Sequence, residues 1–132
     1  MTPLLQGSIR TLCVDDQAVV RRGVALVLMA HDDVELVGEA ASGEEALALC
    51  ETLHPDVVVM DIMMPGMGGV AATRAIRQRW PATYIVGMTS FVQPGLLDEM
   101  CQAGATLCLS KTASSDELIQ AIRAAYRAGP DG

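Results

Sequence analysis

The fold of this chain is indicated most clearly by the stretch VVVMDIMMPG at residues 57–66. Its first four residues are apolar and rich in branched side chains, which is typical of a strand buried on both faces of a parallel sheet. Asp61 follows that run, and Pro65 and Gly66 then mark a turn. A carboxylate at the C-terminal end of a buried strand lies where open α/β sheets carry their chemistry. An aspartate that merely caps the next turn would give the same pattern, so this stretch alone leaves both interpretations open.

Strand-like and helix-like segments alternate along the rest of the chain. Apolar runs bounded by turn residues predict strands, and apolar residues at helical spacing with capping signals predict helices. The expected strands cover 9–14, 34–40, 57–60, 83–88 and 105–110, and the expected helices cover 17–30, 43–53, 69–79, 94–104 and 115–128. Ser42, and Ser114 or Ser115, are the expected N-caps, with Glu45 at a capping-box position. This alternation predicts an α/β, doubly wound, five-stranded parallel sheet with helices on both faces.

Length and composition limit the class of protein. The 132 residues suit one domain, which we place at 9–128, with a tail at 1–8 and a tail or the start of a linker at 129–132. A net charge of −7 without a basic stripe argues against direct nucleic-acid contact by this segment. No signal peptide or membrane-spanning run is evident, so we expect a cytoplasmic location without membrane association. The four cysteines form no C-x-x-C pair and are expected to be structural.

Polar residues gather at the C-terminal ends of the expected strands: Asp15 and Asp16, Asp61, Thr89, and Lys111. In a doubly wound sheet these ends converge on one crevice. Each residue has an ordinary alternative role, as a helix cap, a strand-end threonine or a surface lysine. Their joint occurrence at four strand ends is harder to explain in that way. Three neighbouring carboxylates would repel one another unless a hard cation such as Mg²⁺ lay between them.

This combination of groups suits phosphoryl transfer. A carboxylate is an established phosphoryl-accepting nucleophile. A lysine and a divalent cation offset the charge on the phosphoryl oxygens, and a hydroxyl donates a hydrogen bond to one of them. The sequence therefore predicts a Mg²⁺-dependent phosphoryl-acceptor site.

Four motifs carry a resemblance to a known family: VDD at 14–16, MDIMMPGM at 60–67, MTS at 88–90 and LSK at 109–111. With them the chain resembles, over nearly its whole length, the receiver domains of two-component response regulators, in particular those of the NarL/LuxR type. The resemblance implies a flavodoxin-like (βα)5 fold with strand order 2-1-3-4-5.

For the site, the resemblance implies that Asp61 accepts a phosphoryl group from a sensor histidine kinase. It implies that Mg²⁺ is held by Asp16, Asp61 and the backbone carbonyl of Met63, with Asp15 helping. Thr89 and Lys111 would then bind the phosphoryl oxygens. It also implies a signalling module rather than an enzyme, catalysing only its own phosphorylation and dephosphorylation.

For partners, the resemblance implies a homodimer that forms on phosphorylation through the surface made by the helix at 94–104, the strand at 105–110 and the helix at 115–128. The output would be a C-terminal DNA-binding domain absent from this chain. Three residues depart from the family pattern. Thr112 replaces a frequent proline, Gly68 a frequent aspartate and Cys108 a usual aromatic residue, which puts the familiar aromatic switch in doubt.

Other classes fit the sequence less well. A flavin binder would need a phosphate-binding loop where Asp15 and Asp16 stand. A haloacid-dehalogenase-type phosphatase would need a second aspartate where Met63 stands, and a nicotinamide enzyme would need a G-x-G-x-x-G motif. A purely structural or interaction domain with a degenerate acidic site remains the open alternative.

Overall fold

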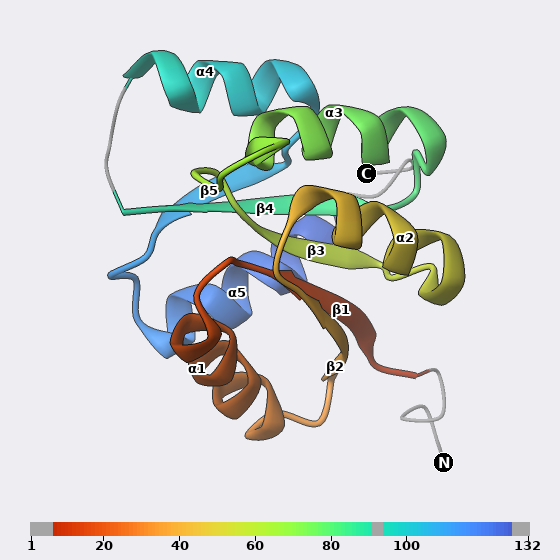
Figure 1. Cartoon of the computed structure of the whole chain (residues 1–132). Coiled ribbons are helices and arrows are strands. Elements are labelled where there is room, and N and C mark those ends of the chain that lie inside the picture. Colours follow the sequence, from red (N-terminus) through yellow and green to blue (C-terminus); the bar gives the residue numbers. More distant parts are fainter. Residues whose placement is uncertain (1–6, 91–93, 128–132) are drawn as a thin grey trace.

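The computed structural model describes residues 7–90 and 94–127, in which five strands and five helices alternate (Figure 1). The elements are β1 (Ile9–Val14), α1 (Ala18–Met29), β2 (Val34–Ala40), α2 (Gly43–Leu53), β3 (Val57–Asp61), α3 (Gly68–Arg79), β4 (Tyr84–Thr89), α4 (Pro94–Ala103), β5 (Leu107–Ser110) and α5 (Ser115–Arg127).

All strand pairs are parallel, and the sheet has the order β2-β1-β3-β4-β5, as the sequence and the resemblance predicted. The middle strand is β3, and each of its five residues is buried. A strand with neighbours on both sides and helices over both faces has no route to solvent, which is why its sequence is apolar without alternation.

Helices cover the two faces of the sheet in unequal numbers (Figure 1). One apolar core lies under α1 and α5 and the other under α2, α3 and α4. Because side chains alternate across a strand, β3 supplies both cores, with Val57 and Val59 on the first side and Val58 and Met60 on the second.

Two helix starts confirm the capping signals. The Glu45 amide donates to Ser42 Oγ at 3.1 Å at the start of α2, although the Glu45 carboxylate accepts from the amide of Ala41 rather than from that of Ser42. At α5 the bonding is reciprocal: the Glu117 amide donates to Ser114 Oγ and the Ser114 amide to the Glu117 carboxylate. These contacts satisfy amides that would otherwise lack partners at a helix N-terminus.

The largest boundary error concerns β5, which begins at Leu107 and not at residue 105. The Ala105 amide donates to the carbonyl of Met100 and so still belongs to the end of α4. Some other predicted boundaries differ by one residue: α1 is shorter at each end, α4 ends at Ala103, β3 includes Asp61, α3 begins at Gly68, and β4 runs from Tyr84 to Thr89. The predicted end of the last helix at residue 128 and most of the two predicted tails lie outside the described residues.

Candidate functional site

The sheet register brings the predicted site residues to one edge. Val14 pairs with Met60, so Asp15 and Asp61 follow at neighbouring strand ends. Asp61 itself pairs with Met88, the residue before Thr89. Thr89 pairs with Ser110, the residue before Lys111. The expected convergence of the strand ends is therefore present.

The three aspartates form one acidic cluster. One carboxylate oxygen from each of Asp15, Asp16 and Asp61 lies within 4.8 Å of the other two. Asp15 and Asp61 are each only 2% exposed, whereas Asp16 is exposed. Such a set of hard oxygen donors, open to solvent through Asp16, has the chemistry that a hexacoordinate Mg²⁺ requires.

Lys111 joins the cluster as its cation. Its Nζ lies 2.8 Å from Asp15 Oδ2 and 3.3 Å from Asp61 Oδ2. Burial opposes the charge of Lys111, but the hydrogen bond to Asp15 and the charge of Asp61 outweigh it, so the pKa of Lys111 is raised. Lys111 is therefore held charged between the two buried carboxylates.

The two carboxylate oxygens of Asp61 have different surroundings. Oδ1 accepts from the amide of Met63 at 3.1 Å. Oδ2 is buried and, within the described part of the chain, its contact with Lys111 is an ion pair without hydrogen-bond geometry. Burial and the neighbouring charge of Asp15 raise the pKa of Asp61 from 3.8 to about 6. Burial and Asp15 thus disfavour the anionic form of Asp61, and a bound cation or phosphoryl group would offset that cost.

We expect Asp61→Asn to stabilise the metal-free protein above pH 6. The native pKa of Asp61 lies above its unfolded value, so the wild-type protein loses stability as pH rises from about 4 to about 6. The variant escapes this loss, which amounts to about 1–3 kcal/mol. Urea denaturation in EDTA should therefore favour the variant at about pH 8 and show little difference at about pH 4.

Asp98→Asn is a matched control, because Asp98 is exposed on α4 and outside the cluster. An equal gain for Asp61→Asn at both pH values would contradict the assignment of the penalty to the ionised Asp61.

Thr89 ends β4 and is 2% exposed. Its backbone carbonyl accepts from the amide of Lys111 at 2.8 Å, so Thr89 and Lys111 are tied through their backbones. Met63, expected to offer a backbone carbonyl, follows the strand end with its side chain 49% exposed. Phe91, two residues after Thr89, lies outside the described residues.

Gly69 has a role in shaping the site that the sequence showed only as part of a turn. A Cβ at this position would lie 2.2 Å from the carbonyl oxygen of Asp61 and 2.6 Å from Ile62 Cα. Only glycine permits this close approach. Gly69 therefore lets α3 begin directly against the backbone of Asp61.

Sequence reasoning missed two further residues. Ser110 organises the turn after Lys111, because its hydroxyl accepts from the amide of Thr112 and lies 2.7 Å from the Thr112 hydroxyl. Arg21 contacts the backbone carbonyl of Asp15. The contacts of Ser110 are local, because a serine hydroxyl in a turn commonly bonds the backbone two residues further on. No local pattern marks Arg21, which acts through a contact that the tertiary fold creates.

The structural role expected of the cysteines holds for Cys13 and Cys50, which are buried; burial raises the pKa of their thiols to about 12 and about 11. Cys108 is half-buried. Cys101 is exposed, so the expectation that Cys101 packs as a small hydrophobic residue is wrong.

No described helix is both long and apolar enough to span a membrane.

An acidic cluster with a lysine at the C-terminal edge of a five-stranded doubly wound sheet defines a receiver-type domain. Residues 11–123 match the family model of the response regulator receiver domain. The chain belongs to this family.

Individual relatives agree with that assignment. The chain is 40% identical to the transcriptional regulatory protein LiaR of Bacillus subtilis, covering 92% of this chain and 58% of LiaR. It is 41% identical to the response regulator GacA of Pseudomonas viridiflava, covering 89% of this chain and 55% of GacA. It therefore spans little more than half the length of these relatives.

Two solved structures show the same fold. The signal receiver domain of the response regulator NarL from Mycobacterium tuberculosis superposes with a TM-score of 0.88 at 30% identity, covering 92% of this chain and 98% of that domain. A LuxR-family two-component response regulator from Aurantimonas sp. SI85-9A1 superposes with a TM-score of 0.87 at 35% identity. The match covers 95% of this chain and 92% of that chain.

Proposed function

We propose that this receiver domain accepts a phosphoryl group on Asp61 from the phosphohistidine of a sensor histidine kinase, in a Mg²⁺-dependent reaction. The observation that carries the proposal is the convergence of three carboxylates and Lys111 around a buried Asp61 oxygen that, among residues 7–90 and 94–127, has no hydrogen-bond partner. A structural domain would have little reason to keep such an arrangement, because burying mutually repelling carboxylates costs stability.

In the transfer step, an oxygen of Asp61 forms a bond to phosphorus as the bond between phosphorus and the histidine nitrogen breaks. The imidazole leaves with the electron pair of that bond. Lys111, already between Asp15 and Asp61, offsets negative charge on the phosphoryl oxygens. The Thr89 hydroxyl would donate to one of these oxygens from the adjacent strand end.

Asp16, Asp61 and the Met63 carbonyl would hold the cation, with Asp15 contributing from the buried side of the cluster. Bound there, Mg²⁺ supplies positive charge that offsets the charge of the acceptor and of the incoming phosphoryl group. The fit rests on the oxygen-only donor set and on the spacing of the three carboxylates.

The direct test is labelling of the isolated domain by the small phosphodonor acetyl phosphate. We expect one phosphoryl group per chain by intact mass in the presence of Mg²⁺ and none in EDTA. A domain that stays unlabelled in Mg²⁺, while a related receiver is labelled in parallel, would contradict the proposal.

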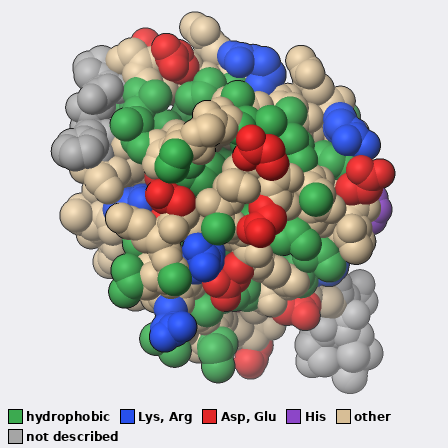
Figure 2. All heavy atoms as spheres, in the orientation of Figure 1, with side chains coloured by type: hydrophobic (Ala, Val, Ile, Leu, Met, Phe, Trp, Pro, Cys, Tyr) green, Lys and Arg blue, Asp and Glu red, His purple; other side chains and the backbone are tan. Residues whose placement is uncertain are grey.

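For the whole protein, we propose a cytoplasmic transcription regulator with a DNA-binding domain C-terminal to the receiver. Support comes from the relatives, of which this chain spans 58% and 55%, and from their description as regulators. The receiver itself would not contact nucleic acid. The Lys and Arg side chains visible on one face lie as separate groups among acidic and apolar ones (Figure 2).

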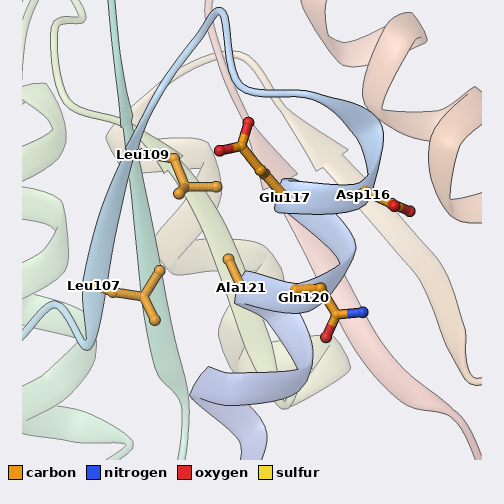
Figure 3. A pocket seen from close by; sticks show the side chains of 6 residues that line it. All are labelled: Leu107, Leu109, Asp116, Glu117, Gln120 and Ala121. Carbon is orange, nitrogen blue, oxygen red and sulfur yellow. The ribbon is translucent and has the colours of Figure 1, made fainter.

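We propose that phosphorylation drives homodimerisation through the surface formed by α4, β5 and α5. A hollow of about 400 Å³ lies on this surface, between β5 and α5. Leu107 and Leu109 point from β5 towards Ala121 of α5, and Glu117 lies beside them (Figure 3). This apolar floor offers area for a contact, while the acidic side chains at its rim would oppose dimer formation until the surface rearranges.

Met63 should help to set the lifetime of the phosphorylated state. Its half-exposed apolar side chain, two residues after Asp61, has no group to orient a hydrolytic water. We therefore expect slow self-dephosphorylation and expect Met63→Asn to change the decay rate by about 3- to 10-fold, toward faster hydrolysis if the amide orients water. Loss of phosphorylated mass after donor removal measures the rate. An unchanged rate in Met63→Asn, with Met29→Asn as an exposed control on α1, would show that the steric explanation is wrong.

A further inference from the structure

The Arg21 side chain extends from α1 to the C-terminal ends of the neighbouring strands β1 and β2. Its Nη1 donates to the backbone carbonyl of Asp15 at 2.7 Å, and its Nε donates to Glu39 Oε1 at 3.0 Å. The Arg21 side chain is only 19% exposed, so these charge-assisted bonds form in a partly desolvated setting. Glu39 belongs to β2 and fixes the orientation of the guanidinium.

With Arg21, Asp15 is held at every polar atom. Its amide donates to the carbonyl of Ala40, and its Oδ1 accepts from the amide of Gln17. Its Oδ2 contacts Lys111, and its carbonyl accepts from Arg21. A residue held at four atoms has little freedom, so the start of the acidic loop is rigid.

The bond from Arg21 has a consequence for Asp16. The Asp15 carbonyl and the Asp16 amide belong to one planar peptide unit. Fixing that carbonyl therefore fixes the direction in which the chain enters Asp16. Within the described residues the exposed Asp16 carboxylate has no hydrogen bond or ion pair of its own, so its position in the cluster depends on this backbone.

We propose that Arg21 is a positioning residue for the candidate Mg²⁺ site: it holds the peptide between Asp15 and Asp16 so that both carboxylates face Asp61. This inference rests on the proposed function. Arg21 touches neither the cation nor the phosphoryl group in this scheme and acts through the backbone of the two aspartates.

A positioning role and a purely electrostatic role of Arg21 predict opposite changes in Mg²⁺ affinity when Arg21 is replaced by a neutral residue. Removing a positive charge near a cation site lessens repulsion and should tighten Mg²⁺ binding. Removing a group that holds ligands in place should weaken binding, typically by 10- to 100-fold for outer-sphere partners. The sign of the change in affinity therefore separates the two effects.

The experiment compares Arg21→Gln with Arg22→Gln by calorimetric titration of Mg²⁺ into the metal-free domain. Arg22 is exposed on the same helix and, within the described residues, its side chain makes no hydrogen bond or ion pair, so it controls for charge. The shorter, neutral glutamine cannot make both contacts of Arg21. We expect roughly tenfold weaker binding for Arg21→Gln and a change within about twofold for Arg22→Gln.

Two further variants guard against a merely structural effect. Arg21→Lys keeps a donor for the Asp15 carbonyl and should recover part of the affinity. Arg21→Met keeps an apolar stem of similar length but removes the charge and both donors, so it should weaken binding in the same direction, and it replaces Arg21→Gln if that variant does not fold. Unchanged or tighter binding in Arg21→Gln, or in Arg21→Met where it is used instead, would overturn the inference. A wild-type domain that binds no Mg²⁺ would instead refute the proposed function.

Discussion

Asp61→Asn is expected to abolish phosphoryl labelling by acetyl phosphate. The asparagine has nearly the same shape and can still accept a hydrogen bond from the Met63 amide, but its amide is not a nucleophile. Intact mass should show one added phosphoryl group on the wild-type domain and none on the variant. Asp15 should not substitute, because its two carboxylate oxygens already bind the Gln17 amide and Lys111.

Asp98→Asn again provides the matched control, since it removes one exposed carboxylate on α4 and leaves the cluster intact. It should be labelled as the wild-type domain is. Undiminished labelling of Asp61→Asn would show that the acceptor lies elsewhere. Thermal unfolding in EDTA should show that the unlabelled variant is folded and at least as stable as the wild-type protein above pH 6, as expected from the raised pKa of Asp61.

Thr89→Ala is expected to separate phosphorylation from dimerisation. Thr89 lies at the edge where β4 pairs with Ser110 of β5, and its carbonyl binds the Lys111 amide. A hydroxyl drawn toward a phosphorylated Asp61 would therefore move the end of β4 and, through these contacts, β5. A bias of a few kcal/mol is sufficient to shift most of a two-state population.

Without the hydroxyl, the domain should still accept phosphate, but its phosphorylation-dependent dimer should weaken by about 10-fold or more. Sedimentation with and without acetyl phosphate measures the dimer, and intact mass confirms that both proteins are equally labelled. Equal dimerisation of labelled wild-type and Thr89→Ala proteins would exclude the hydroxyl as the coupling group.

Cys108→Ala tests whether the switch passes through the position at which the resemblance to receiver domains led us to expect an aromatic residue. The Cys108 sulfur packs over Gly87, 2.9 Å from where a Cβ would lie, and beside Met100. This small, half-buried side chain has one χ angle and cannot exchange between two large positions. Cys108→Ala should leave coupling nearly intact, and a labelled variant that fails to dimerise would show that Cys108 carries the signal.

Several features of the site could not be predicted from the sequence. The raised pKa of Asp61 depends on its burial and on the position of Asp15, two residues whose separation in the chain says nothing about their distance. The contact of Arg21 with the Asp15 carbonyl requires a particular side-chain path from α1. The late start of β5 follows from the hydrogen bond between Ala105 and Met100, which keeps Ala105 in the turn that closes α4.

The sequence by itself determined the alternation of elements, the buried middle strand and the residues that reach the functional edge. It could do so because hydrophobic periodicity, caps and turns are local, and parallel strands place their C-terminal ends together. The tertiary structure alone decided how far apart the carboxylates lie, how deeply Asp15 and Asp61 are buried, where Lys111 lies between them, and how Arg21 holds the Asp15 backbone. Those properties arise from distances and burial that sheet register and helix packing set between residues far apart in the chain.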